Sequence, residues 1–155
     1  MHIRPARPAE AELLTGIALR AKAYWGYGEA FMAACRDELT LDAAVIGRAS
    51  ASTVVAEDGG RLLGFAVLTP APPSGELDML FVEPDLIGRG IGRALFHHVR
   101  DEARALGLRR LTVDSDPHAE PFYLAMGATR IGSAPSGSIP GRELPLMEVE
   151  LAPGA

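Results

Sequence analysis

Three glycines past the middle of the chain have a spacing that can serve chemistry. Gly88, Gly90 and Gly92 stand between an apolar stretch and an amphipathic one, in the segment PDLIGRGIGRAL. Because glycine lacks a side chain, the backbone there can turn tightly and direct several N–H groups toward one point. The start of the following helix and the charges of Arg89 and Arg93 add positive potential at that point. The pattern predicts a site for an anion.

The distribution of charge points to the same place. The chain has a net charge of -5, yet the stretch from Gly88 to Arg110 holds six arginines against Asp101 and Glu102. A solvated, arginine-rich helix face is the simpler interpretation of such a stretch when it is taken alone. The glycines in front of it favour a phosphate-bearing ligand. The acidic balance of the whole chain argues against nonspecific binding of nucleic acid.

Two common nucleotide-binding loops do not fit this segment. A Walker A loop ends in Gly-Lys-Ser/Thr, whereas Gly92 is followed by Arg93 and Ala94. A dinucleotide-binding fold places its glycine loop near the first strand of a βαβ unit, whereas this loop lies past the middle of the chain.

The segment ELDMLFVEPDLIGRGIGRAL resembles the strand, loop and helix of the GCN5-related N-acetyltransferases, whose loop pattern is Gln/Arg-x-x-Gly-x-Gly/Ala. Ile87 departs from the first position of that pattern. A second match begins with Ala119-Glu120-Pro121-Phe122-Tyr123, continues with Met126-Gly127-Ala128, and resembles the family's Asn-x-x-Ala-x-x-Phe-Tyr and Gly-Phe segment. Asp116 stands where the family often has Asn, and Ala128 where it often has Phe. The two matches together cover residues 76–128.

The resemblance implies that acetyl-CoA is the acyl donor, and nothing in the sequence indicates a metal. It implies that the donor lies where two parallel strands splay apart, with its pantetheine arm paired to the backbone at Leu80 and Val82. The pyrophosphate would then rest on backbone amides of the glycine loop. The residues expected to bind the donor are Leu80, Phe81, Val82, Gly88, Arg89, Gly90, Ile91, Gly92, Arg93, Asp116 and Phe122.

Acetyl transfer to an amine needs a group that removes a proton from the amine and a group that protonates the departing thiolate. The Phe-Tyr match implies that Tyr123 is the acid, the alternative being a buried tyrosine that only packs near the sheet. Glu76 lies four residues before Leu80, a position from which several family members present a catalytic glutamate. Asp78, two residues further on, is the second candidate for the base. The alternative is that both carboxylates only attract a cationic substrate.

The acceptor site is expected in two segments outside these matches. Trp25 and Tyr27 flank a glycine where the helical pattern of the N-terminal region breaks, and aromatic side chains there suit a substrate wall or packing between helices. The proline-rich segment 133–143 is too long for a tight hairpin, and loops of that length are often functional. Ser136, Ser138 and Arg142 are its candidates for contact with the acceptor.

The order of secondary structure predicts the frame that holds these residues. A short strand at 2–6, helical segments between Pro8 and Arg48, a hairpin about Asp58-Gly59-Gly60, and a strand at 76–82 come first. A helix with Ile91, Leu95, Val99, Ala103 and Leu106 on one face, a strand at 110–115, a short helix and two final strands follow. We expect one α/β domain over residues 1–155, a mixed and mostly antiparallel sheet flanked by helices.

The remaining expectations concern surroundings and partners. Neither a signal peptide nor an 18-residue apolar run is present, which places the protein in the cytoplasm with no membrane association. Cys35 is the only cysteine, and the four histidines lack the spacing of a zinc site. The acceptor is a primary amine, either a small molecule or part of a peptide, and a homodimer is expected because the family often forms one. A CoA-binding module without catalytic activity is the alternative function.

Overall fold

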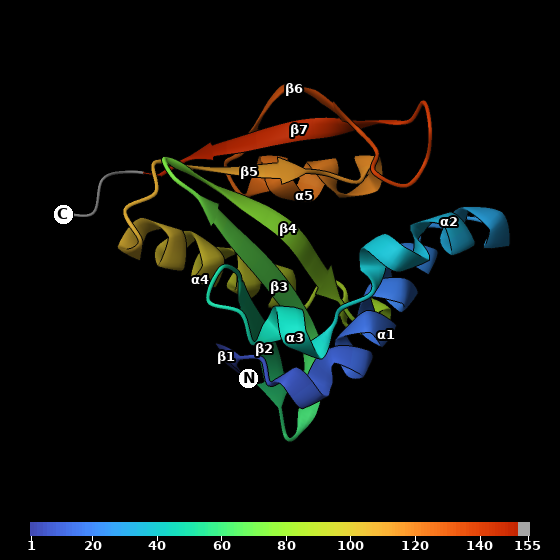
Figure 1. Ribbon diagram of the computed structural model, residues 1–155, viewed down its shortest axis with the longest axis horizontal. Helices are drawn as coiled ribbons and strands as arrows, with labels where there is room; N and C mark the ends of the chain where they lie inside the picture. The colour runs from blue at the N-terminus through green and yellow to red at the C-terminus, as the bar shows by residue number, and fades with distance from the viewer. Residues whose placement is uncertain (152–155) are drawn as a thin grey trace.

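A seven-stranded sheet in the order β1-β2-β3-β4-β5-β7-β6 organises the computed structural model, which describes residues 1–151 (Figure 1). All neighbouring pairs are antiparallel except β4 and β5, which run parallel. The strands are β1 (His2–Pro5), β2 (Ser52–Asp58), β3 (Arg61–Ala71), β4 (Ser74–Val82), β5 (Arg110–Asp114), β6 (Thr129–Pro135) and β7 (Glu143–Glu150). The predicted fold class is confirmed.

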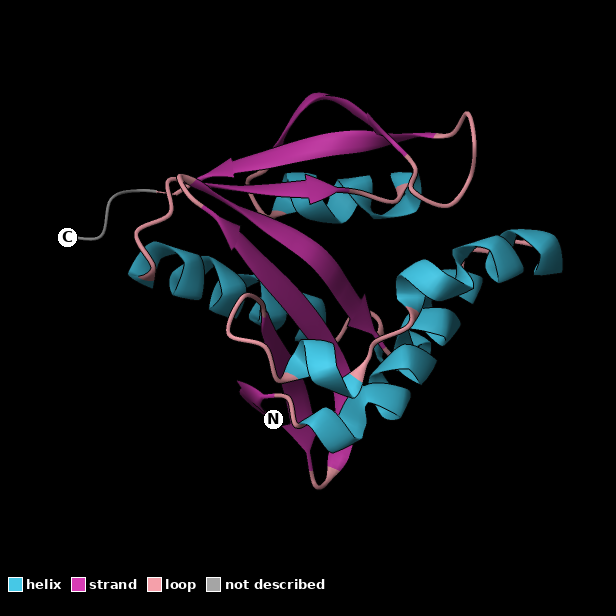
Figure 2. Ribbon diagram, in the orientation of Figure 1, coloured by secondary structure: helices cyan, strands magenta, loops and turns pink. Residues whose placement is uncertain are grey.

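Helices cover the sheet on both sides (Figure 2). They are α1 (Ala11–Ala23), α2 (Glu29–Leu39), α3 (Ala43–Ile46), α4 (Ile91–Ala105) and α5 (Glu120–Ala125), with short 3-10 turns at Pro8–Glu10, Pro84–Leu86 and Pro117–Ala119. None of the helices within residues 1–151 is long and apolar enough to cross a membrane.

The two faces of the sheet build two separate cores. On one face, α4 buries Ile91, Leu95, Val99 and Ala103 against the strands, as the helical spacing predicts. On the other face, α1 buries Leu14 and other apolar side chains against β2 and β3. Leu106, expected on the buried face of α4, is 55% exposed because the helix ends at Ala105 and the chain turns away at Gly107.

The sheet opens at its parallel junction. β4 and β5 pair only over Ser74–Glu76 and Arg110–Thr112, although β4 continues to Val82. Beyond that point the two strands diverge, so that β5, β7 and β6 form one arm of a V and β1 to β4 the other (Figure 1). The interior of this V is where the site lies.

A β-bulge interrupts β4 just beyond the residues that pair with β5. Leu77 pairs with Leu68 and Met79 with Val67, which leaves Asp78 without a partner across the strand pair. Bulges bend a strand and reverse the alternation of its side chains. Leu77 accordingly packs in the core under α4, whereas Met79 packs in the core under α1. The simple alternation that would put Glu76 and Asp78 on one strand face is therefore interrupted at Asp78.

Candidate active site

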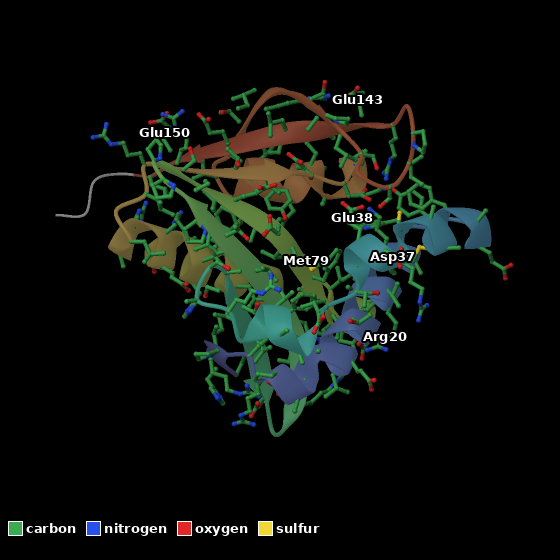
Figure 3. The ribbon with its side chains drawn as sticks, in the orientation of Figure 1. Arg20, Asp37, Glu38, Met79, Glu143 and Glu150 are labelled. Carbon is green, nitrogen blue, oxygen red and sulfur yellow. The ribbon has the colours of Figure 1, made fainter. Side chains whose placement is uncertain are left out.

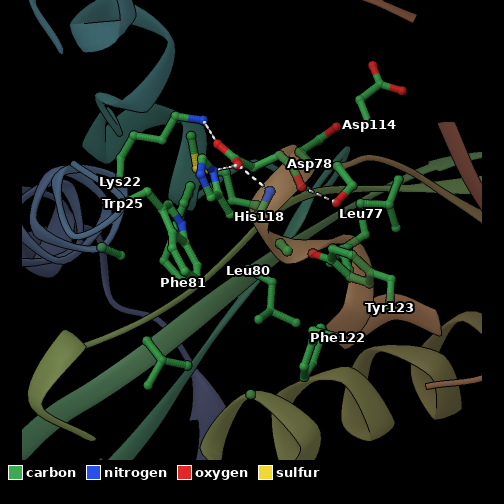
Figure 4. A pocket seen from close by; sticks show the side chains of 18 of the residues that line it. Lys22, Trp25, Leu77, Asp78, Leu80, Phe81, Asp114, His118, Phe122 and Tyr123 are labelled. Carbon is green, nitrogen blue, oxygen red and sulfur yellow. Dashed lines mark hydrogen bonds and ion pairs between the residues drawn. The ribbon is translucent and has the colours of Figure 1, made fainter. Parts of the chain in front are cut away.

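The diverging strands enclose a cavity of about 710 Å³. Its wall combines residues from β4, the glycine loop, the start of α4, the ends of β5 and α1, and the loop before β7. Figure 4 shows Lys22, Trp25 and His118 on one side of this space and Asp78, Asp114 and Tyr123 on the other. The sequence segments predicted to bind the donor and the acceptor therefore meet around one cavity.

The glycine loop takes the conformation that its sequence predicts. Gly88 and Gly90 have φ angles of 86° and 81°, in the left-handed region that favours glycine. Gly90 is the N-cap of α4 and has no side chain that could cap the helix. The backbone N–H of Ala94 donates the first hydrogen bond of the helix, to the carbonyl oxygen of Gly90 at 3.0 Å. The N–H groups in the first turn of α4 thus remain free to receive an anion.

Ten of the eleven residues expected to bind the donor line the cavity. They are Leu80, Phe81, Val82, Gly88, Gly90, Ile91, Gly92, Arg93, Asp116 and Phe122. Arg89 lies beside the cavity rather than in its wall, and its backbone N–H is directed to the carbonyl oxygen of Leu86 at 3.4 Å. Phe122 packs so closely over the start of α4 that a Cβ on Gly92 would lie 3.4 Å from its ring.

Tyr123 lies at the bottom of the cavity with 6% of its surface exposed. Its ring meets those of Phe96 and Phe122 edge to face, at centroid distances of 6.2 and 5.1 Å. Figure 4 shows its hydroxyl pointing toward the middle of the cavity. Burial raises the pKa of Tyr123 above its ordinary value, so that the hydroxyl keeps its proton and can donate it.

Four carboxylates gather at the end of the cavity near β4 and β5: Glu38, Glu76, Asp78 and Asp114. Burial, with the nearby charges of Asp78 and Asp114, raises the pKa of Glu76. Burial raises the pKa of Asp78, with the charge of Asp114 adding to the effect, although a hydrogen bond from Thr69 opposes it. Burial and the charge of Glu38 raise the pKa of Asp114. Within residues 1–151 no basic side chain forms an ion pair with any of the four.

The residues expected to contact the acceptor divide into two groups. Trp25, Ser136 and Arg142 line the cavity. Tyr27 lies behind the wall, where its ring stacks on the Phe31 ring with 4.0 Å between centroids. Burial, together with a hydrogen bond from its hydroxyl to Asp116, raises the pKa of Tyr27 to about 12. The hydroxyl of Ser138 donates to Glu38, which joins the loop before β7 to α2. Figure 3 labels Glu38 where α2 approaches that loop.

Four residues of the cavity wall with acidic or basic side chains were not among the sequence candidates: Lys22, Glu38, Asp114 and His118. Lys22 and Glu38 belong to α1 and α2, and only the packing of these helices brings them to the strand ends. Asp114 ends β5 at the point where the sheet opens, a position that a sequence motif does not mark. His118 lies two residues after Asp116, and its place in the family-like segment was the one available signal.

The carboxylate of Asp116 connects the segments around the cavity. It accepts hydrogen bonds from Lys22 Nζ at 2.6 Å, from the Tyr27 hydroxyl at 2.9 Å and from the His118 backbone N–H at 2.8 Å. Arg142 Nη2 lies 3.6 Å away. Burial alone would raise the pKa of Asp116, but the hydrogen bonds from Lys22 and His118 and the charge of Lys22 outweigh it and hold the pKa well below its usual value.

Comparison with known proteins gives a consistent result. The model of the acetyltransferase (GNAT) family matches residues 18–128. An amino-acid acetyltransferase of Ralstonia nicotianae is 42% identical over 85 residues, which are 54% of this chain, and the chain spans only 19% of the length of that relative.

Two solved structures have the same fold over nearly the whole chain. A GCN5-related N-acetyltransferase from Rhodopseudomonas palustris is 28% identical, with a TM-score of 0.77 over 97% of this chain and 95% of its own. The PaiA N-acetyltransferase from Thermoplasma acidophilum, solved in complex with coenzyme A, is 17% identical, with a TM-score of 0.77 over 96% of this chain and 98% of its own.

Proposed function

Because the chain belongs to the acetyltransferase (GNAT) family, we propose that it transfers the acetyl group of acetyl-CoA directly to a primary amine of a cationic acceptor. The observation that carries this proposal is the cavity itself. It joins the glycine loop, a buried tyrosine and a group of carboxylates that form no ion pair within residues 1–151 in one continuous space between β4 and β5.

The residues around the cavity fit acetyl-CoA. The free N–H groups of the first turn of α4, with Arg93 beside them, suit a pyrophosphate. The backbone of β4 beyond Glu76 has lost its partner strand β5, so that its polar groups on that side are available to an amide-containing arm. When bound, acetyl-CoA supplies an activated thioester to the site.

The protein side chains then move the protons of the reaction. A carboxylate, Glu76 in our assignment and Asp78 as the alternative, takes a proton from the ammonium group of the acceptor, directly or through water. The neutral amine forms the new C–N bond as the C–S bond breaks, and the Tyr123 hydroxyl gives its proton to the departing thiolate. The acylated nitrogen then loses its extra proton to the Tyr123 oxygen, directly or through water, which restores the hydroxyl. A raised pKa makes the carboxylate a better base, and burial keeps the Tyr123 hydroxyl protonated until the thiolate leaves.

Release of free thiol from acetyl-CoA, measured over a panel of amines, tests this function. The panel should contain monoamines, diamines, neutral amino acids and basic peptides. Turnover with at least one cationic amine is the expected result. Tight binding of CoA without turnover on any amine would favour the CoA-binding module instead, and failure to bind CoA would contradict both functions.

A further inference from the structure

We propose that Asp116 is a positioning residue that fastens the turn between α1 and α2, residues 24–28, across the cavity and so holds Trp25 in the wall of the acceptor site. The part of this inference that concerns the acceptor rests on the proposed function. The fastening itself does not, because it concerns only contacts within the chain.

The contacts of Asp116 come from distant parts of the sequence. Lys22 lies in the last turn of α1 and Tyr27 in the turn that follows, and both reach a residue that begins the turn after β5. Arg142, from the loop before β7, approaches the same carboxylate and donates from Nη2 to the Tyr27 hydroxyl at 2.7 Å. One carboxylate therefore contacts side chains from the end of α1, the turn that follows it and the loop before β7.

Aromatic packing connects Asp116 to Trp25 in the cavity wall. The Trp25 ring stacks on the His118 ring, with 5.0 Å between centroids and 9° between planes. His118 is held in turn by Asp116, which accepts from its backbone N–H at 2.8 Å and lies 2.9 Å from its Nδ1. Trp25 thus contacts the segment after β5 through a histidine that Asp116 orients.

Burial and charge make Asp116 better suited to this role than to contact with the donor. Its side chain is 12% exposed, and those of Lys22 and Arg142 are 14% and 18% exposed. Its two oxygens already accept hydrogen bonds from Lys22, Tyr27 and His118. An uncharged asparagine, which the family often has at this place, would leave two poorly exposed cations facing each other without an anion.

The single tryptophan of the chain gives a direct measurement, because all tryptophan fluorescence reports on Trp25. We would compare acrylamide quenching in the wild type, Asp116→Asn, Lys22→Met and Lys22→Arg. Asp58→Asn serves as the control, since Asp58 is an exposed aspartate at the end of β2, away from the cavity. Quenching should increase in Asp116→Asn and Lys22→Met, and stay at the wild-type level in Lys22→Arg and in the control. The double variant Asp116→Asn/Lys22→Met should be no more quenched than either single variant.

Kinetics separate positioning from contact with the donor. With an acceptor found in the amine panel, Asp116→Asn and Lys22→Met should each raise the KM of the acceptor by roughly tenfold, because small misplacement of a binding wall is costly. CoA affinity, measured by calorimetry, should not change. Weaker CoA binding in Asp116→Asn but not in Lys22→Met would overturn the proposal and make Asp116 a donor contact. Unchanged quenching in both variants would also overturn it.

The two proposals fail in different ways. If the wild type acetylates no amine, the proposed function fails, while the quenching series still decides whether Asp116 fastens the turn. If turnover is present but quenching and acceptor KM do not respond to Asp116→Asn and Lys22→Met, the function stands and the positioning role is wrong.

Discussion

The hydroxyl of Tyr123 can be removed without disturbing its packing. Tyr123→Phe keeps the ring between Phe96 and Phe122, so CoA affinity should remain as in the wild type. Turnover should fall by on the order of 10²-fold over the whole pH range, which is the usual contribution of a general acid. Steady-state kinetics with calorimetry of CoA binding checks this. Near-normal turnover would assign Tyr123 a structural role only.

The pH dependence of activity in two variants distinguishes which carboxylate of β4 is the base. Glu76→Gln should lose activity mainly at low pH, where the acceptor amine is protonated and a base is needed most. Asp78→Asn is the matched variant, since it lies two residues further along the same strand and lines the same cavity. A selective loss at low pH in Asp78→Asn, with none in Glu76→Gln, would move the base to Asp78.

The Glu76→Gln substitution should not weaken the fold. Glu76 has a raised pKa in the folded protein, so the folded state binds its proton more tightly than the unfolded chain does. Folding therefore loses stability as the pH rises through this range, and above it the charge is a net cost. Glu76→Gln should leave the melting temperature at neutral pH unchanged or higher. A lower melting temperature would show that the carboxylate makes favourable contacts in the fold.

Among the local elements, the glycine loop offers the clearest test. Gly90 has a φ of 81°, and a branched side chain there should force the loop out of the left-handed region, at a cost of about 1–3 kcal/mol. Gly90→Val should therefore weaken acetyl-CoA binding by about tenfold or more, because the amides of the loop no longer point at one place. Gly132→Ala is the control, since Gly132 lies in β6 with open space around it. Unchanged affinity in a folded Gly90→Val variant would contradict the assignment of the loop.

The sequence predicts the elements better than it predicts where they bend. The hairpin at Gly59 and Gly60, the glycine loop and the apolar face of α4 follow local rules, and all three are present in the structure. The bulge at Asp78 has no local signal, because it depends on how β3 pairs with β4. Likewise, Lys22 and Glu38 reach the cavity only through helix packing, so that neither could be assigned from spacing.

At the scale of the whole molecule, four carboxylates make one end of the cavity acidic. Since Glu38, Glu76, Asp78 and Asp114 lack basic partners within residues 1–151, acceptors with two positive charges should have lower KM values than monoamines of the same length. The difference should shrink as salt rises toward 1 M, where the screening length is about 3 Å.

A pair of adjacent residues on α2 tests the origin of this preference. Glu38→Gln should weaken the preference for the doubly charged acceptor by several-fold, as expected for one partly exposed charge. Asp37→Asn, which removes an exposed charge outside the cavity wall, should leave it unchanged. Equal KM values for singly and doubly charged amines in the wild type would show that the acidic end does not select the acceptor.

The divergence of β4 from β5 gives the sheet an additional edge in its interior. Exposed strand edges are a hazard, because they offer unpaired N–H and C=O groups to any other extended chain. Here that edge lies in a cavity whose wall includes residues of α1, α5 and the glycine loop, and these elements stand between it and other extended chains. The fold thereby keeps backbone groups available for recognition without exposing them to aggregation with other chains.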